Sequence, residues 1–368
     1  MSDYLTSIVN KLTKTYKNVH IAKDNTENIK FISTGSKAFD LMLDGGIPWG
    51  YVSELSGLSQ SGKSLFVQML IANAQKDYNG IGILVDRENA YTPNRGTALG
   101  IDNDRLLIAK PSDTPTPIVA FQFIIDSITG IREQEIAQKK KDEKAGKKIK
   151  EKVYILIAID SIAAFGKDTT LDKADMGRKA KSVHEGLREL IPHLDEHMSL
   201  VVANQITYKI GIMFGDPKTT TSGESMKYYS NVRLNLEEFK RIIDSDRGNE
   251  VLGNWIRIQV EKTRLGPCYR QCFVRHLYKT GVDVYSGYAR FLADKNYIKP
   301  KNKEEFLKFK QVSFKYKGKT FSTENTADFL KQYSELDFNT FPEWCENPQF
   351  EEEEKPKKSK KKVNKEKE

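Results

Sequence analysis

Residues 57–64 read Gly57-Leu58-Ser59-Gln60-Ser61-Gly62-Lys63-Ser64. A β-rich run, YVSEL (51–55), precedes this stretch, and LFVQMLIANAQ (65–75) follows it with apolar residues at helical spacing. The pattern G-x-x-x-x-G-K-[ST] between a strand and a helix is typical of a phosphate-binding loop. Its glycines let backbone N–H groups approach phosphate oxygens, Lys63 reaches the β and γ phosphates, and the Ser64 hydroxyl binds Mg²⁺. The stretch therefore predicts a site for a nucleoside triphosphate with Mg²⁺, and the alternative is a chance glycine turn.

Three further β-rich runs end in polar residues that suit the same chemistry. Asp160 closes YILIAID (154–160), at the edge where sheets of this kind place their ligands, and we expect it to hold Mg²⁺. Glu88 follows IGILVD (81–86) and is a candidate to orient or deprotonate water, unless it is an ordinary exposed loop carboxylate. Gln205 closes SLVVANQ (199–205), where an amide could sense the γ-phosphate.

The fold class follows from the alternation of β-rich and helical stretches between residues 31 and 283. This alternation favours an α/β fold with a mainly parallel sheet flanked by helices. The run YILIAID is apolar almost throughout, as a strand covered on both faces should be. The predicted strands cover 51–55, 81–86, 105–108, 153–160, 200–204, 231–236 and 255–261.

The segments outside this core have their own patterns. Apolar residues at helical spacing predict an amphipathic helix over 3–17, on a polar tether, that docks on its own core or on a neighbouring subunit. Apolar and aromatic residues continue through 285–350, and the charged end should be disordered. We therefore divide the chain into 1–30, a core of 31–283, a small C-terminal domain of 284–350 and a tail of 351–368.

The charge balance indicates an anionic partner. The 368 residues include 59 Lys+Arg and 50 Asp+Glu, for a formal charge of +9. Such an excess suits nucleic acid or an acidic membrane surface. The lysine-rich stretch 132–152 and the tail 351–368 together contribute +6 of this charge. The stretch 132–152 has too little apolar content to pack, so we interpret it as an exposed helix extension or a flexible insertion.

Several classes of protein are disfavoured by the same sequence. No stretch approaches the ~20 consecutive apolar residues of a membrane span, and the first residues lack a signal-peptide pattern. We therefore expect a soluble, intracellular protein. Cys268, Cys272 and His276 have the spacing C-x3-C-x3-H, which is not a usual zinc spacing, so we expect reduced thiols in or near a strand.

An unusual stretch follows the run SLVVANQ, at residues 206–226 (ITYKIGIMFGDPKTTTSGESM). It is rich in Gly, Thr and Ser around the apolar cluster Ile210, Ile212, Met213 and Phe214. We expect a mobile loop, because such a stretch cannot bury these side chains in a core of its own. Exposed apolar groups beside lysines and hydroxyls suit insertion against nucleic-acid bases. The alternative is a lid over the nucleotide.

Two groups of residues resemble the RecA family. ISTGS (32–36), Ala38, Asp40 and GGIPWG (45–50) resemble the entry to the RecA core. NQI (204–206), KIGIMFGDP (209–217) and TTT (219–221) resemble its second DNA-binding loop. The resemblance runs from about residue 5 to residue 300, and the bacterial RecA and phage UvsX branches are both candidates. It implies a RecA-like P-loop ATPase core, an N-terminal polymerisation helix and a small C-terminal domain.

The resemblance assigns roles in the nucleotide site. Glu88 is the general base, Lys63 binds phosphates, and Gln205 couples the γ-phosphate to the DNA loop. Lys262 and Arg264 match a pair of lysines that reach the ATP of a neighbouring subunit; a solvated strand edge is the alternative. Tyr228 matches an aromatic residue at that subunit interface. The implied ATP contacts are Gly57, Leu58, Ser59, Gln60, Ser61, Gly62, Lys63, Ser64, Asp160, Arg95 and Tyr278, with Ser64 and Asp160 on Mg²⁺.

The resemblance also assigns DNA contacts. The first DNA loop corresponds to 168–178, and the implied contacts in and after it are Met176, Gly177, Lys181 and Arg188. In the second loop they are Tyr208, Lys209, Ile210, Gly211, Met213, Phe214, Thr219 and Gly223. Ile210 corresponds to the wedge between base triplets.

This chain departs from the family pattern at several positions. The tyrosine that stacks on adenine corresponds to Arg95, so stacking passes to the guanidinium or to Tyr91. Thr207 replaces an arginine of the second loop, and Ser222 replaces a glycine after it. The stretch 132–152 has no counterpart in bacterial RecA, and the tail ends basic where a RecA tail is typically acidic.

As a whole, the resemblance implies a DNA-dependent ATPase that forms a helical filament on single-stranded DNA. The filament would pair that strand with homologous double-stranded DNA in recombination and repair, in the cytoplasm (the host cytoplasm if phage-encoded). Single-strand-binding and mediator proteins are candidate partners, and a membrane is not. The rival interpretations are a RecA-fold hexameric helicase or motor and a low-turnover mediator paralogue.

Overall fold

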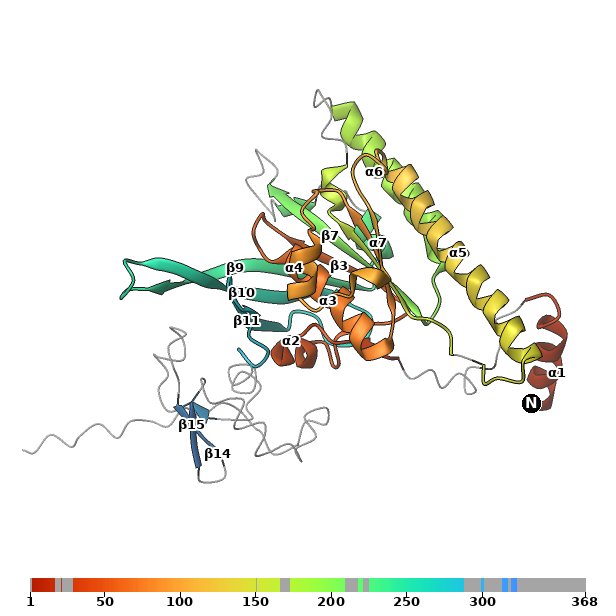
Figure 1. Cartoon of the computed structure of the whole chain (residues 1–368), viewed down its shortest axis with the longest axis horizontal. Coiled ribbons are helices and arrows are strands. Elements are labelled where there is room, and N and C mark those ends of the chain that lie inside the picture. The colour runs from red at the N-terminus through yellow and green to blue at the C-terminus, as the bar shows by residue number, and fades with distance from the viewer. Residues whose placement is uncertain are drawn as a thin grey trace, which may run out of the picture.

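The computed structural model describes residues 2–16, 21, 29–149, 151–165, 173–208, 218–220, 225–287, 299–300, 313–316 and 319–322. Its largest unit is an α/β core built on one ten-stranded sheet (Figure 1). The predicted tail 351–368 and most of the predicted C-terminal domain lie outside the described residues.

The sheet has the order β12-β11-β10-β9-β3-β7-β6-β4-β5, and β8 pairs with β7. The strands from β9 to β5 pair in parallel, whereas β10, β11 and β12 add antiparallel at one side. The bounds are β3 Val52–Gly57, β4 Ile81–Asp86, β5 Leu106–Ala109, β6 Ile155–Asp160, β7 Met198–Tyr208, β8 Lys218–Thr220, β9 Val232–Asp244, β10 Glu250–Thr263, β11 Gln271–Leu277 and β12 Gly281–Val282. The predicted mainly parallel sheet is thus confirmed.

The predicted strand bounds match in β4, differ by one or two residues in β3, β5 and β6, and are too short in β7, β9 and β10. β4 begins and ends at the predicted residues, and β6 is buried along its whole length. β7 and β9 continue beyond their predicted ends, because they pair with β8 and β10 in hairpins that extend past the packed helices. The β9–β10 hairpin projects from the core in Figure 1.

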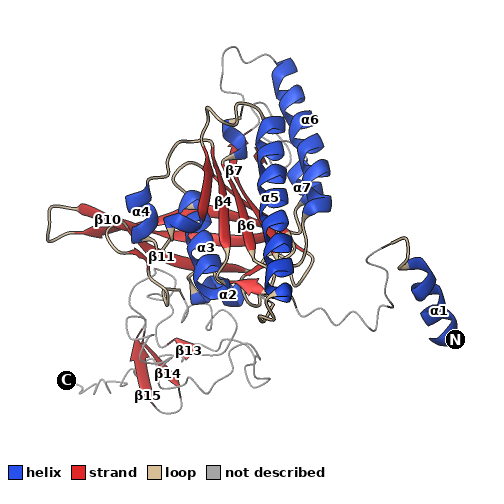
Figure 2. Ribbon diagram, turned by 45° about the vertical axis from the view of Figure 1, so that its right-hand side comes forward, coloured by secondary structure: helices blue, strands red, loops and turns tan. Residues whose placement is uncertain are grey.

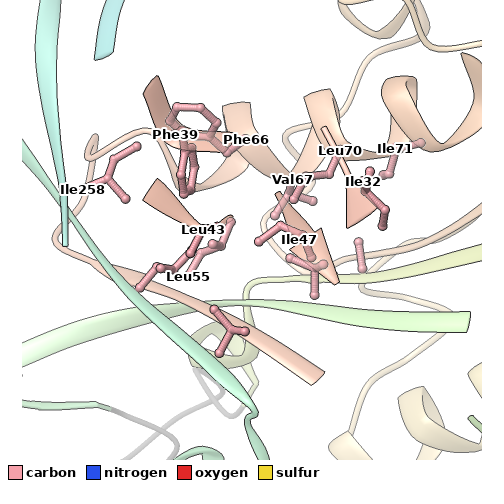
Figure 3. Packing of buried hydrophobic residues seen from close by; sticks show 14 of the residues in the cluster. Ile32, Phe39, Leu43, Ile47, Leu55, Phe66, Val67, Leu70, Ile71 and Ile258 are labelled. Atoms are coloured by element: carbon pink, nitrogen blue, oxygen red, sulfur yellow. The ribbon is translucent and has the colours of Figure 1, made fainter. Parts of the chain in front are cut away.

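Helices cover both faces of the sheet. α2 (Lys37–Met42) and α3 (Lys63–Tyr78) pack on one face, where the Phe39 and Phe66 rings meet edge to face with centroids 5.2 Å apart (Figure 3). α5 (Pro117–Lys144) and α6 (Lys173–Leu190) lie side by side on the other face (Figure 2). Because successive side chains along a strand point to opposite faces, each buried strand contributes side chains to the core on both sides of the sheet.

Short elements complete the core. They are the β1–β2 pair (Phe31–Ile32 and Ile47–Pro48), α4 (Pro93–Ala98), α7 (Ser225–Tyr229) and the 3-10 turns η2 (Asn103–Arg105), η3 (Ile162–Ala164) and η4 (Ile191–His193). α7 connects the second-loop region to β9, and α4 lies between β4 and β5 along the chain.

The lysine-rich stretch extends α5. The helix continues through Lys144, about 18 Å beyond Arg132 at 1.5 Å per residue. Its base is fixed where the Arg132 guanidinium donates to Glu135 at 2.6 Å and to the Val153 carbonyl at 3.0 Å. Lys152 also pairs with Asp195 at 2.8 Å. Of the two interpretations of this stretch, the helix extension therefore describes residues 132–144.

The N-terminal helix is shorter than predicted. α1 covers Ser2–Leu12 rather than 3–17, and most of the tether lies outside the described residues. The apolar side chains Leu5, Ile8 and Leu12 are exposed, so the predicted docking face has no cover within the described chain. Near the other end, β13 (Lys299–Pro300), β14 (Ser313–Tyr316) and β15 (Lys319–Ser322) form a three-stranded antiparallel sheet.

None of the described helices is long and apolar enough to cross a membrane.

Candidate functional site

The predicted phosphate loop joins β3 to α3 in a tight turn. Gln60 and Gly62 have φ values of 63° and 94°, so the backbone coils in the left-handed region that glycine adopts most readily. A Cβ atom on Gly57 would lie 2.4 Å from both the Leu236 carbonyl oxygen and Ser61 Oγ. The loop thus needs glycine for close packing at 57 and for backbone conformation at 62, and it leads into the positive end of α3.

Lys63 is turned back over this loop. Its Nζ donates to the Leu58 carbonyl at 2.7 Å and to the Gly57 carbonyl at 3.1 Å. Burial lowers the pKa of Lys63, and the negative charges of Glu88 and Asp160 oppose that effect. A triphosphate would give this buried ammonium an anionic partner in place of neutral carbonyls.

Asp160 lies at the carboxyl end of β6 and is only 4% exposed. Burial raises its pKa to about 6, whereas a hydrogen bond with Ser64 lowers it. Its Oδ1 atom is buried and has no hydrogen-bond partner among the described residues. A carboxylate with an unpaired oxygen beside a hydroxyl is the hard oxygen donor set that Mg²⁺ prefers. The residues present therefore fit the ion.

Two carboxylates follow β4, and they have different surroundings. Asp86 is buried and accepts hydrogen bonds from the backbone N–H groups of Ala90 and Tyr91, which fixes the turn after the strand. Glu88 is exposed, accepts a hydrogen bond from Ser161 Oγ at 2.7 Å, and is electrostatically coupled to Lys63. Glu88 is therefore both a loop carboxylate, as its alternative interpretation held, and a neighbour of the phosphate loop.

The end of β7 lies beside the phosphate loop. Gln205 pairs in register with Gly57, and Asn204 pairs with Ser56. Because side chains alternate along a strand, Asn204 and Gln205 point to opposite faces of the sheet. Asn204 is fully buried and donates to Glu54 Oε1 at 2.7 Å.

The predicted cation pair, Lys262 and Arg264, lies at the opposite edge of the sheet from the phosphate loop, where β3 and β9 begin. Thr263 pairs with Val232 at the start of β9, and Val232 in turn flanks Ser53 near the start of β3. The Arg264 N–H donates to the Asn231 carbonyl just before β9. Ser53 lies four positions before Gly57 on β3, which is about 13 Å at 3.3 Å per residue. Lys262 and Arg264 are therefore remote from the phosphate loop of their own chain.

Comparisons with known proteins agree with this arrangement. A family model described as the RecA N-terminal domain matches residues 3–131 and 129–283. The protein RecA of Thioalkalivibrio sulfidiphilus is 32% identical over 261 residues, which cover 69% of this chain and 68% of the relative. The RecA proteins of Chlorobaculum parvum and Chlorobaculum tepidum are each 31% identical over 263 residues, 70% of this chain and 68% of each relative.

This chain belongs to the RecA family. It is therefore a RecA-type recombinase, with a function in DNA recombination and repair.

The surroundings of Lys262 and Tyr228 suit an interface role in a RecA-family protein. Lys262 Nζ donates to the Lys227 carbonyl at 2.6 Å, so the cation pair lies next to α7. Burial and the charges of Arg264 and Arg233 lower the pKa of Lys262. Tyr228 follows on α7 with 70% of its surface exposed. The exposed ring and the crowded cations occupy one edge of the sheet, where another subunit could cover them.

The residues predicted to contact the base lie near one another. Arg95 on α4 is electrostatically coupled to His276, whose ring packs against Tyr278 with centroids 5.4 Å apart. Tyr278 is exposed, whereas Tyr91 packs against the core and donates its hydroxyl proton to Asn103 Oδ1 at 2.6 Å. The Tyr91 hydroxyl is thus engaged with Asn103, and the choice between Arg95 and Tyr91 for base stacking stays a prediction.

The residues predicted to contact DNA are partly described. Met176 and Gly177 lie on α6, and so do the exposed side chains of Lys181 and Arg188. Thr219 pairs in register with Thr207, and Tyr208 is the last residue of β7. Lys209, Ile210, Gly211, Met213, Phe214, Ser222 and Gly223 lie outside the described residues, as does 168–172 of the first loop.

Part of the predicted mobile loop is regular structure. Residues Lys218–Thr220 pair antiparallel with Ile206, Thr207 and Tyr208, so the second loop begins as a β-hairpin. The expectation of a loop from residue 206 was wrong for this stem. The run of threonines, which favours strands, was a signal that could have revealed it.

Cys272 lies in β11 and Cys268 three residues before it, so the expected position in or near a strand is confirmed. Cys268 and Cys272 are free, and Cys272 is buried in β11, where burial raises its pKa well above the ordinary value. Within the described part of the chain, the group of ligand atoms close enough for a metal is Asp195, Glu196 and His197 rather than the cysteines. Lys152 and Arg132 already pair with Asp195 there.

Proposed function

We propose that this protein is an ATP-dependent DNA recombinase whose subunits assemble head to tail on single-stranded DNA and share their ATP sites. The assembled filament pairs the bound strand with a homologous duplex and exchanges strands. The cofactors are ATP and Mg²⁺, and the compartment is the cytoplasm.

The observation that carries the proposal is the placement of the two halves of the site on opposite edges of one sheet. Lys63 begins α3 just after the carboxyl end of β3, and Asp160 is the last residue of β6. Lys262 pairs in register with Arg233, and Arg233 pairs with Glu54 in the amino-terminal half of β3. A cation at the second edge reaches a triphosphate only if that triphosphate belongs to another subunit. Such an interface is heterologous, and it generates a ring or an open helix.

The residues around the phosphate loop suit hydrolysis. Lys63 and the loop N–H groups hold the phosphates, while Ser64 and Asp160 supply oxygen ligands for Mg²⁺. Bound Mg²⁺ would neutralise charge that develops on the phosphate oxygens. Glu88, oriented by Ser161, accepts a proton from the attacking water. Lys262 and Arg264 of the adjacent subunit add positive charge in the manner of arginine fingers, so hydrolysis depends on assembly.

The DNA-binding elements follow from the same topology. β7 carries Gln205 next to the phosphate loop and continues directly into the β7–β8 hairpin. A movement of Gln205 in response to the γ-phosphate would thus be transmitted along β7 to the second DNA loop, which begins three residues later. Polar contacts from this loop and from α6 go to the DNA backbone, Ile210 inserts between base triplets, and base pairing supplies sequence recognition.

Strand-displacement loop formation tests the proposal. Purified protein with ATP, Mg²⁺, a single-stranded oligonucleotide and a homologous supercoiled duplex is expected to form joint molecules, and a heterologous duplex is the control. Joint molecules that ignore homology, or none at all, would contradict the proposal.

Two further measurements separate the rival functions. Electron microscopy with ATP and single-stranded DNA is expected to show open helical filaments, and closed hexamers would favour the ring motor. ATP hydrolysis is expected to rise when single-stranded DNA is added, whereas a mediator paralogue would show no stimulation.

A further inference from the structure

Glu54 is a buried carboxylate that has no role in the ATP, Mg²⁺ or DNA contacts proposed above. It lies within β3, its exposed fraction is 0%, and it pairs in register with Arg233 on β9. A buried carboxylate is costly unless it is both paired and hydrogen-bonded. Glu54 meets both needs: Arg233 Nε donates to Oε2 at 2.5 Å, and Asn204 Nδ2 donates to Oε1 at 2.7 Å.

The two partners of Glu54 lead toward opposite edges of the sheet. Asn204 immediately precedes Gln205, which pairs with Gly57 at the nucleotide edge. Arg233 Nη2 lies 3.4 Å from Glu261 Oε2, and Glu261 immediately precedes Lys262. The polar contacts therefore run without a break from the strand of the γ-phosphate sensor to the strand of the cation pair.

The charges of this network also act on the pKa of Lys262. The charge of Arg233 lowers the pKa of Lys262, whereas the charge of Glu54 raises it. Glu54 thus offsets repulsion where three cations, Arg233, Lys262 and Arg264, gather at one edge.

Stability alone does not explain such a pair. Well-packed apolar residues usually stabilise a core as well as a buried ion pair does, and the best-attested benefit of the ion pair is a fixed relative position of the elements that carry it. Hydrogen bonds are directional, so Glu54 restricts how β7 and β9 lie relative to β3.

We propose that Glu54 is a positioning residue that links the ATP site of a subunit to the cations which that subunit supplies to its neighbour. The inference rests on the proposed function, because it requires sites shared between subunits. The network fixes the strand that carries Lys262 and Arg264 relative to the strand that carries Gln205. The state of one ATP site thereby sets the position of the cations in the next.

The test uses filaments mixed from an acceptor and a donor. The acceptor, Arg264→Ala, keeps its own phosphate loop but supplies a defective cation pair. The donor, Glu88→Gln, keeps nucleotide binding and its cation pair but lacks the general base. ATP is hydrolysed efficiently only where the donor's cations meet the acceptor's nucleotide, so hydrolysis stimulated by single-stranded DNA reports how well the donor places them.

The decisive donor carries Glu54→Gln and Arg233→Gln in addition to Glu88→Gln. Both charges are removed together, so no unpaired charge stays buried. Hydrolysis in the mixture is expected to fall about tenfold to 100-fold relative to the plain donor, the loss expected when charged groups are misplaced by about 1 Å. Co-sedimentation with DNA checks that equal amounts of each donor enter the filament.

A matched control uses the ion pair between Arg257 and Glu237. These residues lie on the same two strands, β10 and β9, in a part-exposed position away from the network. A donor with Glu237→Gln and Arg257→Gln is expected to support the same hydrolysis as the plain donor. An equal loss in this control would mean that any change in the two strands disturbs the cations, which would overturn the specific role of Glu54.

The outcomes distinguish the inference from the function on which it rests. If the plain donor fails to restore hydrolysis, shared sites are refuted and the inference fails with them. If the plain and the Glu54/Arg233 donors restore it equally, shared sites stand and Glu54 serves only the fold. If the latter donor does not fold, Glu261→Gln takes its place, because it removes the outer partner at a part-exposed position. A severalfold loss then supports the inference, and no loss overturns it.

Discussion

Gly57→Ala tests whether close packing of the phosphate loop is as strict as the structure indicates. The added Cβ would lie 2.4 Å from the Leu236 carbonyl oxygen, and Leu236 belongs to β9, which is held by β3 on one side and β10 on the other. Because this backbone cannot retreat, the loop must move. Overpacking of this kind costs about 1–3 kcal/mol.

The expected result has two parts. A loss of about 2 kcal/mol lowers Tm by roughly 4–8 °C for a core of this size. Displacement of the loop also moves the Leu58 carbonyl that holds Lys63, so ATP affinity should fall about tenfold, equivalent to ~1.4 kcal/mol. Differential scanning fluorimetry gives the first quantity, and titration with a fluorescent ATP analogue gives the second.

Gly130→Ala is the matched control. Gly130 lies within α5, and a Cβ there would meet no atom within 4 Å. Alanine is favoured over glycine inside a helix by about 0.8–1 kcal/mol, so Tm should rise by about 2–4 °C while ATP affinity stays unchanged. If both variants have the same Tm and bind ATP equally, the packing argument at Gly57 is refuted.

Three further predictions concern charge. Burial raises the Asp160 pKa to about 6, so the folded protein without nucleotide loses stability as the pH rises from about 4 to 6. Asp160→Asn removes this loss. The variant should therefore be more stable than the parent by roughly 2–3 kcal/mol at pH 8 but not at pH 4. Thermal melts across pH test this, and a pH-independent difference would contradict it. Arg264→Ala should lose DNA-stimulated hydrolysis and recover part of it when mixed with Lys63→Ala; a mixture as inactive as its components would count against shared sites. Deletion of 355–368 should weaken duplex binding at low salt more than single-strand-stimulated hydrolysis, and an equal loss in the two assays would show that the tail has no preference for duplex.

Much of the nucleotide site could be predicted from sequence because its elements are local. The spacing of Gly57, Gly62 and Lys63 places backbone amides and an amine around one turn, whatever surrounds it. Asp160 could be placed at a strand end because a wholly apolar run must be buried. The structure places Lys63, Glu88 and Asp160 together at one edge of the sheet, as this reasoning expected.

Other features could not be read from local pattern. The β7–β8 stem lies within a stretch rich in Gly and Thr, where pairing across a loop decides the conformation. The hydrogen bond from the Tyr91 hydroxyl to Asn103 joins residues 12 positions apart, and no local pattern indicated it. The role of Glu54 was hidden because a glutamate in an apolar strand gives no indication of its partners until Asn204 and Arg233 are brought beside it.

By itself, therefore, the sequence determined that this chain has a phosphate-binding α/β core of the RecA family. Only the tertiary structure decided that Lys63 and the pair Lys262 and Arg264 stand at opposite edges of one sheet. The physical reason is that a motif of eight residues specifies its own turn, whereas the edge at which a distant strand ends depends on whether that strand runs parallel or antiparallel to its neighbours.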